Sequence, residues 1–318
     1  MNLSSFLSLP TAEVATLVRE HGPHVCVFPI NGTRRWFILE YPYEAQSDFS
    51  TQYLVLSGRR HIALYQMLFD HGVETLVTPI FGPDLLERGE EYRQMMESAL
   101  VWFARDADFL SFYDQYDVRV HVYGDAERYL AGTPYAGALE AYRELADRTA
   151  SHRHCRLFFG VCGHDPTERV ASFAVAFHQQ TGRAPTRREI IAHYYGEYID
   201  PVDLFIGFDR PAAFDMPLIA TGSEDLYFMV SPSPYLDERT LRTILFDHAY
   251  TRRVPEDYSE FSPADWSAMR RFYAAHRHSV LGIGDQYDGG KFWYPTVQVF
   301  SAPDALNAPR ADGNQSTE

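Results

Sequence analysis

The sequence runs Phe28-Pro29-Ile30-Asn31-Gly32-Thr33-Arg34-Arg35-Trp36-Phe37 at the end of an apolar segment, His24–Ile30, that predicts a buried strand. The strand ends in a polar, glycine-containing turn. Such a turn presents backbone N–H groups and, with a helix after it, can hold a phosphate or diphosphate. The guanidinium groups of Arg34 and Arg35 suit phosphate oxygens. The turn therefore predicts an anionic ligand, and the alternative is an ordinary surface turn with solvated arginines.

The composition limits the kind of partner. The chain has 318 residues, a formal net charge of −15 and a pI near 5.3. This charge argues against nucleic acid as a partner, because duplex binding depends on a basic surface. An anionic ligand would therefore need a local basic pocket. Aromatic residues make up 15% of the chain, which fits either an aromatic core or a site that holds a large apolar or cationic species against π-faces.

No long linker divides the apolar pattern, so we expect one catalytic domain over residues 1–300. The polar tail, residues 301–318, is expected to be disordered. The start of the chain lacks the pattern of a signal peptide, and no apolar run reaches the length of a transmembrane segment. The three cysteines, an odd number, are consistent with reduced thiols. We expect a soluble cytoplasmic enzyme.

Short apolar runs alternate with segments of helical spacing. The expected strands are His24–Ile30, Thr75–Ile80, Val118–Tyr123, Cys155–Val161, Asp203–Phe208 and Leu226–Val230. The expected helices are Tyr53–Phe69, Glu90–Arg105, Tyr135–Ala150, Pro166–Gln180, Thr186–Tyr195, Asp237–Tyr250 and Pro263–His276, with a short edge strand near Trp293–Phe300. This alternation predicts an α/β fold with a central parallel sheet of about six strands flanked by helices.

Ligands of such sheets bind where loops leave the carboxyl ends of the strands. This rule places six loops around one rim: Asn31 to Arg35, Phe81 to Asp84, Gly124-Asp125, Gly163 to Asp165, Phe208 to Phe214, and Ser231 to Tyr235. We expect the chemistry of the protein to come from these loops and from the first turns of the helices after them.

Several blocks of the sequence resemble a known family. The stretch Phe28–Trp36 looks like the Asp-Gly-Asn-Arg-Arg-Trp motif of cis-prenyltransferases, and the segments that begin at Asp203 and Asp225 sit where that fold has later conserved blocks. A narrower resemblance is to the tuberculosinyl adenosine transferase and isotuberculosinol synthase group, a diterpene-processing branch of this fold that includes kolavelool synthase. It is carried by Met67–Gly72, Pro185–Ile191, Tyr194–Tyr198 and Phe205–Phe208. The resemblance extends to about Gly289.

The resemblance implies a cis-prenyltransferase (undecaprenyl diphosphate synthase)-like fold and an isoprenoid diphosphate substrate. The implied reaction ionises a bicyclic diterpenyl diphosphate of the halimane, labdane or clerodane type, and water captures the allylic cation to give an alcohol. Carried over position by position, the resemblance implies that Gly32, Thr33, Arg34 and Arg35 hold the diphosphate and that Tyr53 takes part in the chemistry. The candidate catalytic residues are Asn31, Tyr53 and Arg35. The candidate substrate-binding residues are Gly32, Thr33, Arg34, Arg35, Trp36, Phe81 and Arg210, the last because it lies on the predicted rim. The resemblance also implies a homodimer.

Residue 31 departs from the family, which has aspartate in this turn. Aspartate can ligate Mg²⁺ and accept a proton, whereas Asn31 offers a neutral carbonyl oxygen and two N–H donors. Either Asn31 orients water or the diphosphate, another carboxylate binds Mg²⁺, or activity is weakened. Asp225 is the candidate carboxylate, because it falls where cis-prenyltransferases carry a metal-binding glutamate, and its alternative is a solvated acid at a strand edge. Two other functions remain open: prenyl transfer to a nucleoside such as adenosine, and non-catalytic binding of an isoprenoid diphosphate.

Overall fold

A computed structural model describes residues 1–82, 90–133, 135–253, 259, 261–287 and 290–296, with the backbone alone for residues 90–97. The strands are β1 (Val25–Val27), β2 (Thr75–Phe81), β3 (Val118–Tyr123), β4 (Cys155–Val161), β5 (Leu204–Phe208), β6 (Asp225–Met229), β7 (Gly284–Tyr287) and β8 (Phe292–Pro295). The α-helices are α1 (Leu3–Leu7), α2 (Thr11–His21), α3 (Thr33–Glu40), α4 (Pro42–Ser47), α5 (Phe49–Asp70), α6 (Glu90–Arg105), α7 (Ala107–Gln115), α8 (Ala126–Leu130), α9 (Ala136–Arg148), α10 (Thr167–Thr181), α11 (Arg187–Tyr195), α12 (Glu238–Phe246) and α13 (Pro263–His276). A 3₁₀ turn covers Ser233–Tyr235, and a π-helical turn, Asp247–Thr251, follows α12.

The first six strands form one parallel sheet in the order β3-β4-β2-β1-β5-β6. The prediction of a central parallel sheet of about six strands is therefore confirmed. Val27 of β1 pairs with Val77 of β2 on one side and with Phe205 of β5 on the other. The carboxyl ends of β2, β1 and β5 are consequently neighbours, although they are far apart in the sequence.

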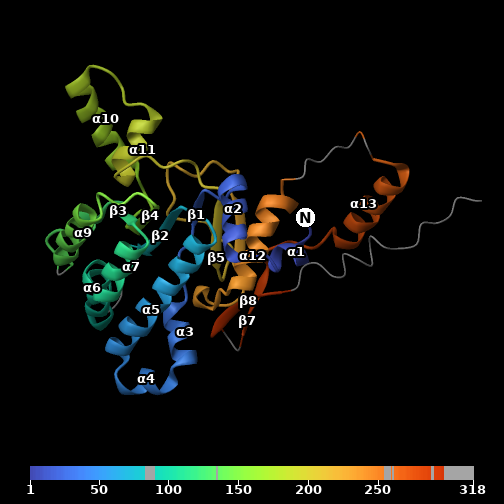
Figure 1. The fold of residues 1–318 in the computed structure, drawn as a ribbon, viewed down its shortest axis with the longest axis horizontal. Coiled ribbons are helices and arrows are strands. Elements are labelled where there is room, and N and C mark those ends of the chain that lie inside the picture. The colour runs from blue at the N-terminus through green and yellow to red at the C-terminus, as the bar shows by residue number, and fades with distance from the viewer. Residues whose placement is uncertain (83–89, 134, 254–258, 260, 288–289, 297–318) are drawn as a thin grey trace, which may run out of the picture. The chain divides into compact units, whose positions relative to one another are not determined.

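The two faces of the sheet pack against different parts of the chain (Figure 1). On one face, Cys26, Phe28 and Leu76 belong to the larger core, which also takes in Leu64 of α5, Phe112 of α7 and buried residues of α9. On the other face, alternate strand residues such as Val27 and Val77 pack with Tyr194 and Tyr195 of α11. The alternation follows from the two-residue period of a strand, which sends neighbouring side chains to opposite faces.

The sequence did not give the bounds of the short helices α1, α2, α3, α4, α7 and α8, although a helix was expected after the turn that leads into α3. The expected short edge strand near Trp293–Phe300 is present in part as β8, which pairs antiparallel with β7 in a separate two-stranded sheet. Residues 297–300 of that prediction lie outside the described residues, as do Asp84 of the second rim loop and the tail 301–318. Periodicity finds apolar segments but cannot show which strand supplies the pairing partner.

The chain divides into two compact units, Met1–Arg252 and Arg253–Glu318. The first unit contains the six-stranded sheet, and the second contains α13 and the β7–β8 hairpin. A single catalytic domain over residues 1–300 stays a prediction.

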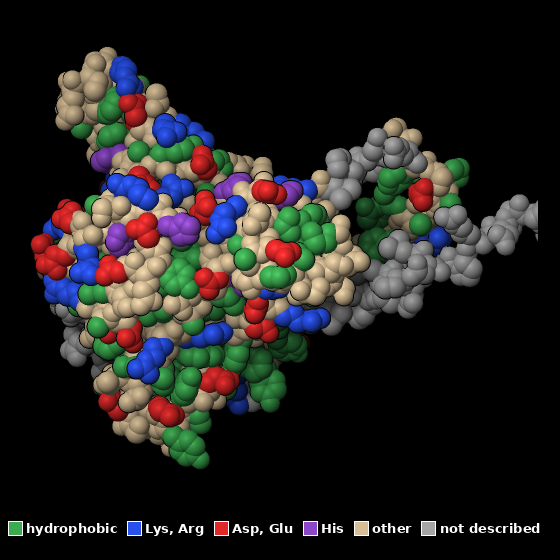
Figure 2. Space-filling model, in the orientation of Figure 1, with side chains coloured by type: hydrophobic (Ala, Val, Ile, Leu, Met, Phe, Trp, Pro, Cys, Tyr) green, Lys and Arg blue, Asp and Glu red, His purple; other side chains and the backbone are tan. Residues whose placement is uncertain are grey.

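The surface mixes charges of both signs. On the face shown in Figure 2, basic side chains lie among acidic ones. None of the helices in the described part of the chain has the length and apolarity that crossing a bilayer requires.

Candidate active site

The turn after β1 is held in a conformation that requires glycine. Gly32 has φ +77°, in the left-handed region. A Cβ at this position would lie 2.8 Å from a ring carbon of Phe208 and 2.9 Å from Cβ of Pro232. The turn is also fixed from the β6 side, because the Asn31 N–H donates to Ser233 Oγ at 3.2 Å and the Ser233 N–H donates to the Asn31 carbonyl at 3.0 Å. Gly32 thus lets the backbone turn where no side chain fits.

Helix α3 starts directly at this turn, with Gly32 as its N-cap and no hydrogen bond from a capping side chain. Its first turn holds Arg34 and Arg35 and no acidic residue. Both arginines lie at the positive end of the helix dipole, where cations are unfavourable and anions are stabilised. The local sequence therefore creates a positive potential and free N–H donors that a bound anion would satisfy.

The two guanidinium groups differ in their surroundings. Arg34 is exposed and lies 5.3 Å from the ring centroid of Phe49, and it has no carboxylate partner among the described residues. Arg35 lies 5.3 Å from the ring centroid of Phe208, and its Nη2 is 3.8 Å from a carboxylate oxygen of Asp209. Both side chains are held beside the turn by aromatic rings, and Arg34 is the one without a competing carboxylate.

A cavity of about 1020 Å³ opens at this turn. Its walls are formed by the β1–α3 turn, the end of β2, helices α5 and α6, and the loops after β4 and β5. The lining residues are Ile30, Asn31, Gly32, Thr33, Arg34, Arg35, Ile38, Tyr53, Leu54, Ser57, Gly58, His61, Thr78, Pro79, Ile80, Phe81, Gly82, Ala99, Trp102, Phe103, His164, Phe214 and Asp215. Four of the six predicted rim loops thus contribute, those after β1, β2, β4 and β5.

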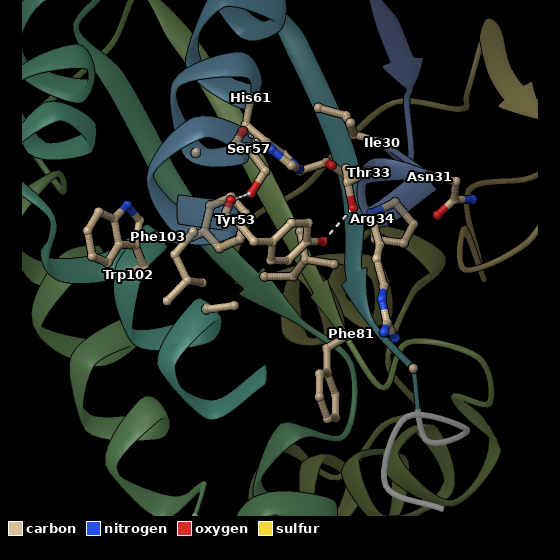
Figure 3. A pocket seen from close by; sticks show the side chains of 18 of the residues that line it. Ile30, Asn31, Thr33, Arg34, Tyr53, Ser57, His61, Phe81, Trp102 and Phe103 are labelled. Carbon is tan, nitrogen blue, oxygen red and sulfur yellow. Dashed lines mark hydrogen bonds between the residues drawn. The ribbon is translucent and has the colours of Figure 1, made fainter. Parts of the chain in front are cut away.

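The cavity is polar at one end and apolar at the other (Figure 3). Asn31 and Arg34 lie on one side, and Trp102 and Phe103 of α6 lie on the opposite side. Helix α6 approaches α5 closely because residue 58 is glycine, whose Cβ would lie 3.1 Å from Nε1 of Trp102. The shape and polarity suit a ligand with an anionic head and a bulky apolar body.

Tyr53 stands between the two ends. Its hydroxyl forms a hydrogen bond of 2.7 Å with Oγ1 of Thr33, drawn as a dashed line in Figure 3. Its ring packs against Phe37 and stacks on Phe49, with centroids 5.5 Å and 5.6 Å away. Tyr53 therefore fixes the first residue of α3 relative to α5.

His61 lies deeper in the cavity and was missed by the sequence analysis. It is 8% exposed, and its ring meets the ring of Phe103 edge to face at a centroid distance of 5.2 Å. Burial lowers the pKa of His61 from 6.5 to about 4, and the hydrogen bond to the Ser57 carbonyl opposes this only in part. A sequence signal existed, since Tyr53, Ser57 and His61 are spaced by four residues and share one face of a helix.

Two predicted site residues lie apart from the cavity. Trp36 is 6% exposed and packs edge to face on Tyr41 at 5.4 Å, so it belongs to the packing of α3. Arg210 is exposed in the loop after β5 and is not a lining residue. The same loop instead contributes Phe214 and Asp215, which the sequence analysis placed at its boundary or missed.

Asp225 is not at the cavity either. It is the first residue of β6, so it lies at the amino edge of the sheet, whereas the cavity lies at the carboxyl edge. Its carboxylate is 2.6 Å from Nδ1 of His248 and 3.3 Å from Nη1 of Arg252. The structure therefore does not bring Asp225 together with the turn at residues 31–35.

The cavity residues do not form a ready-made Mg²⁺ site. Within the described part of the chain, no three His, Cys, Asp or Glu side chains are grouped so that they could hold a metal ion. Residue 31 is asparagine, and Asp215 is the one carboxylate among the lining residues. Mg²⁺ favours carboxylate oxygens, so the donor set fits this ion poorly.

No profile of a known protein family matches the chain. Two curated proteins resemble it. The chain is 44% identical to tuberculosinyl adenosine transferase of Mycobacterium tuberculosis over 300 residues, which cover 92% of this chain and 99% of that protein. It is 27% identical to (+)-kolavelool synthase of Herpetosiphon aurantiacus, over 92% of this chain and 95% of that protein.

Solved structures share the fold at low sequence identity. Lavandulyl diphosphate synthase from Lavandula x intermedia, in complex with dimethylallyl diphosphate, has a TM-score of 0.56 and 15% identity, over 78% of this chain and 100% of that one. A probable undecaprenyl diphosphate synthase from Campylobacter jejuni has a TM-score of 0.53 and 12% identity, over 74% and 97%. The expected cis-prenyltransferase-like fold is confirmed.

We predict that Gly32→Ala weakens pyrophosphate binding and lowers the free energy of unfolding by about 1–3 kcal/mol, because the new Cβ meets Phe208 and Pro232. Gly132→Ala is the matched control, since Gly132 has φ +75° but nothing within 4 Å of its Cβ position. Urea unfolding and calorimetric titration with pyrophosphate measure both quantities. Equal effects of the two substitutions would contradict the claim that close packing fixes the turn.

We predict that the His61 ring stays neutral as the pH falls from 8 to about 5, because its pKa is about 4. In the unfolded chain His61 is protonated below about pH 6.5, whereas in the folded chain it is protonated only below about pH 4. Protonation therefore favours the unfolded state, and the free energy of unfolding decreases as the pH falls through this range. NMR titration of the ring signals checks the protonation. In His61→Phe the free energy of unfolding should decrease less between pH 6.5 and pH 4 than in the unsubstituted protein. His178→Phe, at an exposed position, should leave this decrease unchanged.

Proposed function

The chain belongs to the family of tuberculosinyl adenosine transferase, and on this basis we propose that it is an enzyme that ionises a bicyclic diterpenyl diphosphate and captures the cation with water to give a diterpene alcohol. The halimane, labdane and clerodane skeletons are the candidate substrates. We further propose that it acts in the cytoplasm as a homodimer.

One observation carries this proposal: an anion-binding turn and an aromatic chamber belong to the same cavity. The turn supplies Gly32, Thr33, Arg34 and Arg35 at the start of α3, and the chamber is walled by Leu54, Phe81, Trp102 and Phe103. An isoprenoid diphosphate combines the two matching parts, a charged head and an apolar body. A small polar substrate would leave the aromatic walls without a contact.

In the proposed reaction the allylic C–O bond breaks, and its electron pair stays on the departing pyrophosphate oxygen. The N–H groups of the α3 first turn and the guanidinium groups of Arg34 and Arg35 stabilise the negative charge that develops there. These donors are already oriented, because Gly32 and the Tyr53–Thr33 hydrogen bond fix the turn. The apolar walls exclude stray water, and the aromatic rings stabilise the cation.

Water then forms the new C–O bond and loses a proton. Asn31 cannot accept this proton, because an amide group is not a base near neutral pH. Asp215 is the carboxylate that lines the cavity, at the end of the loop after β5. We assign the proton to Asp215 or to the departing pyrophosphate, and we assign to Asn31 the orientation of the water or the diphosphate. A Mg²⁺ ion at this site would be held mainly by oxygens of the diphosphate, with few ligands from the protein.

Transfer to a nucleoside is the second candidate. The observation that favours it is the 44% identity to a tuberculosinyl adenosine transferase across nearly the whole of both chains. In this reaction a nitrogen of adenosine replaces water as the nucleophile. The third possibility, non-catalytic diphosphate binding, follows from Asn31 alone.

We predict that purified protein releases pyrophosphate from at least one halimane-, labdane- or clerodane-type diphosphate. In H₂¹⁸O the organic product should be an alcohol that carries the label, detected by mass spectrometry. A product that carries adenosine, formed when the nucleoside is added, would select the second candidate. Tight diphosphate binding without turnover, followed by turnover in Asn31→Asp, would select non-catalytic binding and overturn the first.

We predict that Arg34→Ala lowers kcat/KM about 100-fold, because it removes a cation from the developing pyrophosphate charge. Tyr53→Phe should lower it at least about tenfold, since it keeps the ring packing but loses the bond to Thr33. Arg59→Ala and Tyr43→Phe, at exposed positions on α5 and α4, are the matched controls. Steady-state assays together with thermal unfolding separate rate effects from folding effects. Unchanged kcat/KM in both Arg34→Ala and Tyr53→Phe would contradict the assignment of these residues to the active site.

A further inference from the structure

The deep part of the cavity contains two polar side chains among aromatic neighbours. They are His61 on α5, which is 8% exposed, and Thr78 on β2, which is fully buried. Both line the cavity. A pocket that only had to hold a hydrocarbon would be more stable with apolar side chains at these positions, because a buried polar group without a partner is costly.

The hydrogen bonding of His61 defines which ring nitrogen is free. Nδ1 lies 2.7 Å from the carbonyl oxygen of Ser57. A carbonyl oxygen only accepts, so Nδ1 carries the proton and donates. In the neutral ring Nε2 then has a lone pair, and no hydrogen bond to Nε2 is formed within the described residues. His61 therefore offers a hydrogen-bond acceptor in an aromatic pocket.

Thr78 adds a second buried hydroxyl group. Its polar neighbour is the Tyr65 hydroxyl, and neither hydroxyl forms a hydrogen bond of ordinary geometry within the described residues. Burial raises the pKa of Tyr65 above its usual range, and the neighbouring Thr78 hydroxyl opposes this rise. Buried hydroxyl groups in folded proteins are nearly always paired. A Tyr65 hydroxyl that donates to Oγ1 leaves the Thr78 proton available for a ligand atom in the cavity.

His61 lies far from the anion-binding turn along α5, and Tyr65 links it to Thr78, since the Tyr65 ring centroid is 6.1 Å from that of His61 and the Tyr65 hydroxyl neighbours Thr78. Tyr53, which bonds to Thr33 at the turn, and His61 are eight residues apart on one helix. At 1.5 Å per residue this corresponds to roughly 12 Å along α5. A ligand whose diphosphate lies at Thr33 would therefore bring its ring system, rather than its reacting carbon, to His61 and Thr78.

We propose that His61 and Thr78 form a subsite for an oxygen atom on the ring system, so that the preferred substrate is a hydroxylated bicyclic diterpenyl diphosphate. The substrate hydroxyl donates to Nε2 of His61 and accepts from the hydroxyl of Thr78. This inference rests on the proposed function, because it assumes that the diphosphate binds at the turn. It adds the chemical class of the substrate.

The alternative role for His61 is a base that removes a proton from the ring-borne cation. The surroundings argue against it. The ring packs against Phe103 and Tyr65. Among the described residues, no carboxylate contacts it that could balance an imidazolium charge. The pKa of about 4 shows the same preference for the neutral form. A neutral imidazole in this position is a good hydrogen-bond acceptor and a poor proton acceptor.

The test uses two thiolodiphosphate analogues of one labdane skeleton, one with and one without a ring hydroxyl. Their bond to the diphosphate group resists cleavage, so they bind without reacting. Calorimetric titration of the full chain measures the affinity for each. Binding does not depend on turnover, so the result is independent of the capturing nucleophile. We expect the hydroxylated analogue to bind the unsubstituted protein about tenfold more tightly, a typical value for one hydrogen-bonded hydroxyl. Thr78→Val and His61→Phe should each reduce the preference to within about twofold and leave the affinity for the parent analogue unchanged or higher.

Controls separate recognition from folding. Thr78→Ser keeps the hydroxyl and should keep the preference, whereas a purely structural role for Thr78 would not distinguish serine from valine in this ratio. Thr243→Val and His178→Phe, at exposed positions, should change neither affinity.

Equal affinity for the two analogues in the unsubstituted protein overturns the subsite and leaves the proposed function standing; a water molecule held between His61 and Thr78 would give this result. A preference that survives in both Thr78→Val and His61→Phe also overturns it. Failure of the protein to bind either analogue overturns both the subsite and the proposed function.

Discussion

The left-handed turn at Gly32 is the constraint on which the site depends. Phe208 of β5 and Pro232 of the segment after β6 press on this position so closely that no side chain fits. The backbone therefore turns sharply at the end of β1, and α3 begins at this turn, whose residues line the cavity. Because β1 lies between β2 and β5 in the sheet, side chains from both neighbours complete the walls. A side chain at position 32 would collide with Phe208 and Pro232, so the turn and the start of α3 would have to shift.

The electrostatics of the site are local. A chain with a net charge of −15 would repel an anionic ligand at long range, but salt screens exposed charges over about 8–10 Å. The turn offers a helix N-terminus and two guanidinium groups, and one of these, Arg34, has no carboxylate partner among the described residues. Cations are unfavourable at a helix N-terminus, and a diphosphate bound in the proposed position would relieve this repulsion.

Helix α5 connects the two ends of the cavity. Tyr53, Ser57 and His61 follow one another at helical spacing, and each is linked to the next by a hydrogen bond to a backbone carbonyl. The helix thus places a phenol at the anionic end and an imidazole at the deep end. The aromatic excess of the composition has two sources. Tyr65, Tyr113, Tyr123, Tyr194 and Tyr195 are fully buried in the core, and Tyr53, Phe81, Trp102, Phe103 and Phe214 line the cavity.

The sequence by itself determined the alternation of strands and helices, the parallel sheet, and the turn at residues 31–35, because hydrophobic period and turn chemistry are properties of neighbouring residues. It also indicated Tyr53 and Phe81, which the structure places in the cavity. Only the tertiary structure showed that His61, Thr78 and Asp215 join them, and that Asp225 does not. The physical reason is that strands pair in the order β3-β4-β2-β1-β5-β6 rather than in chain order. Asp225 begins its strand and so lies at the amino edge, while the side chains that form the site follow or face the carboxyl ends, and no local pattern records which ends become neighbours.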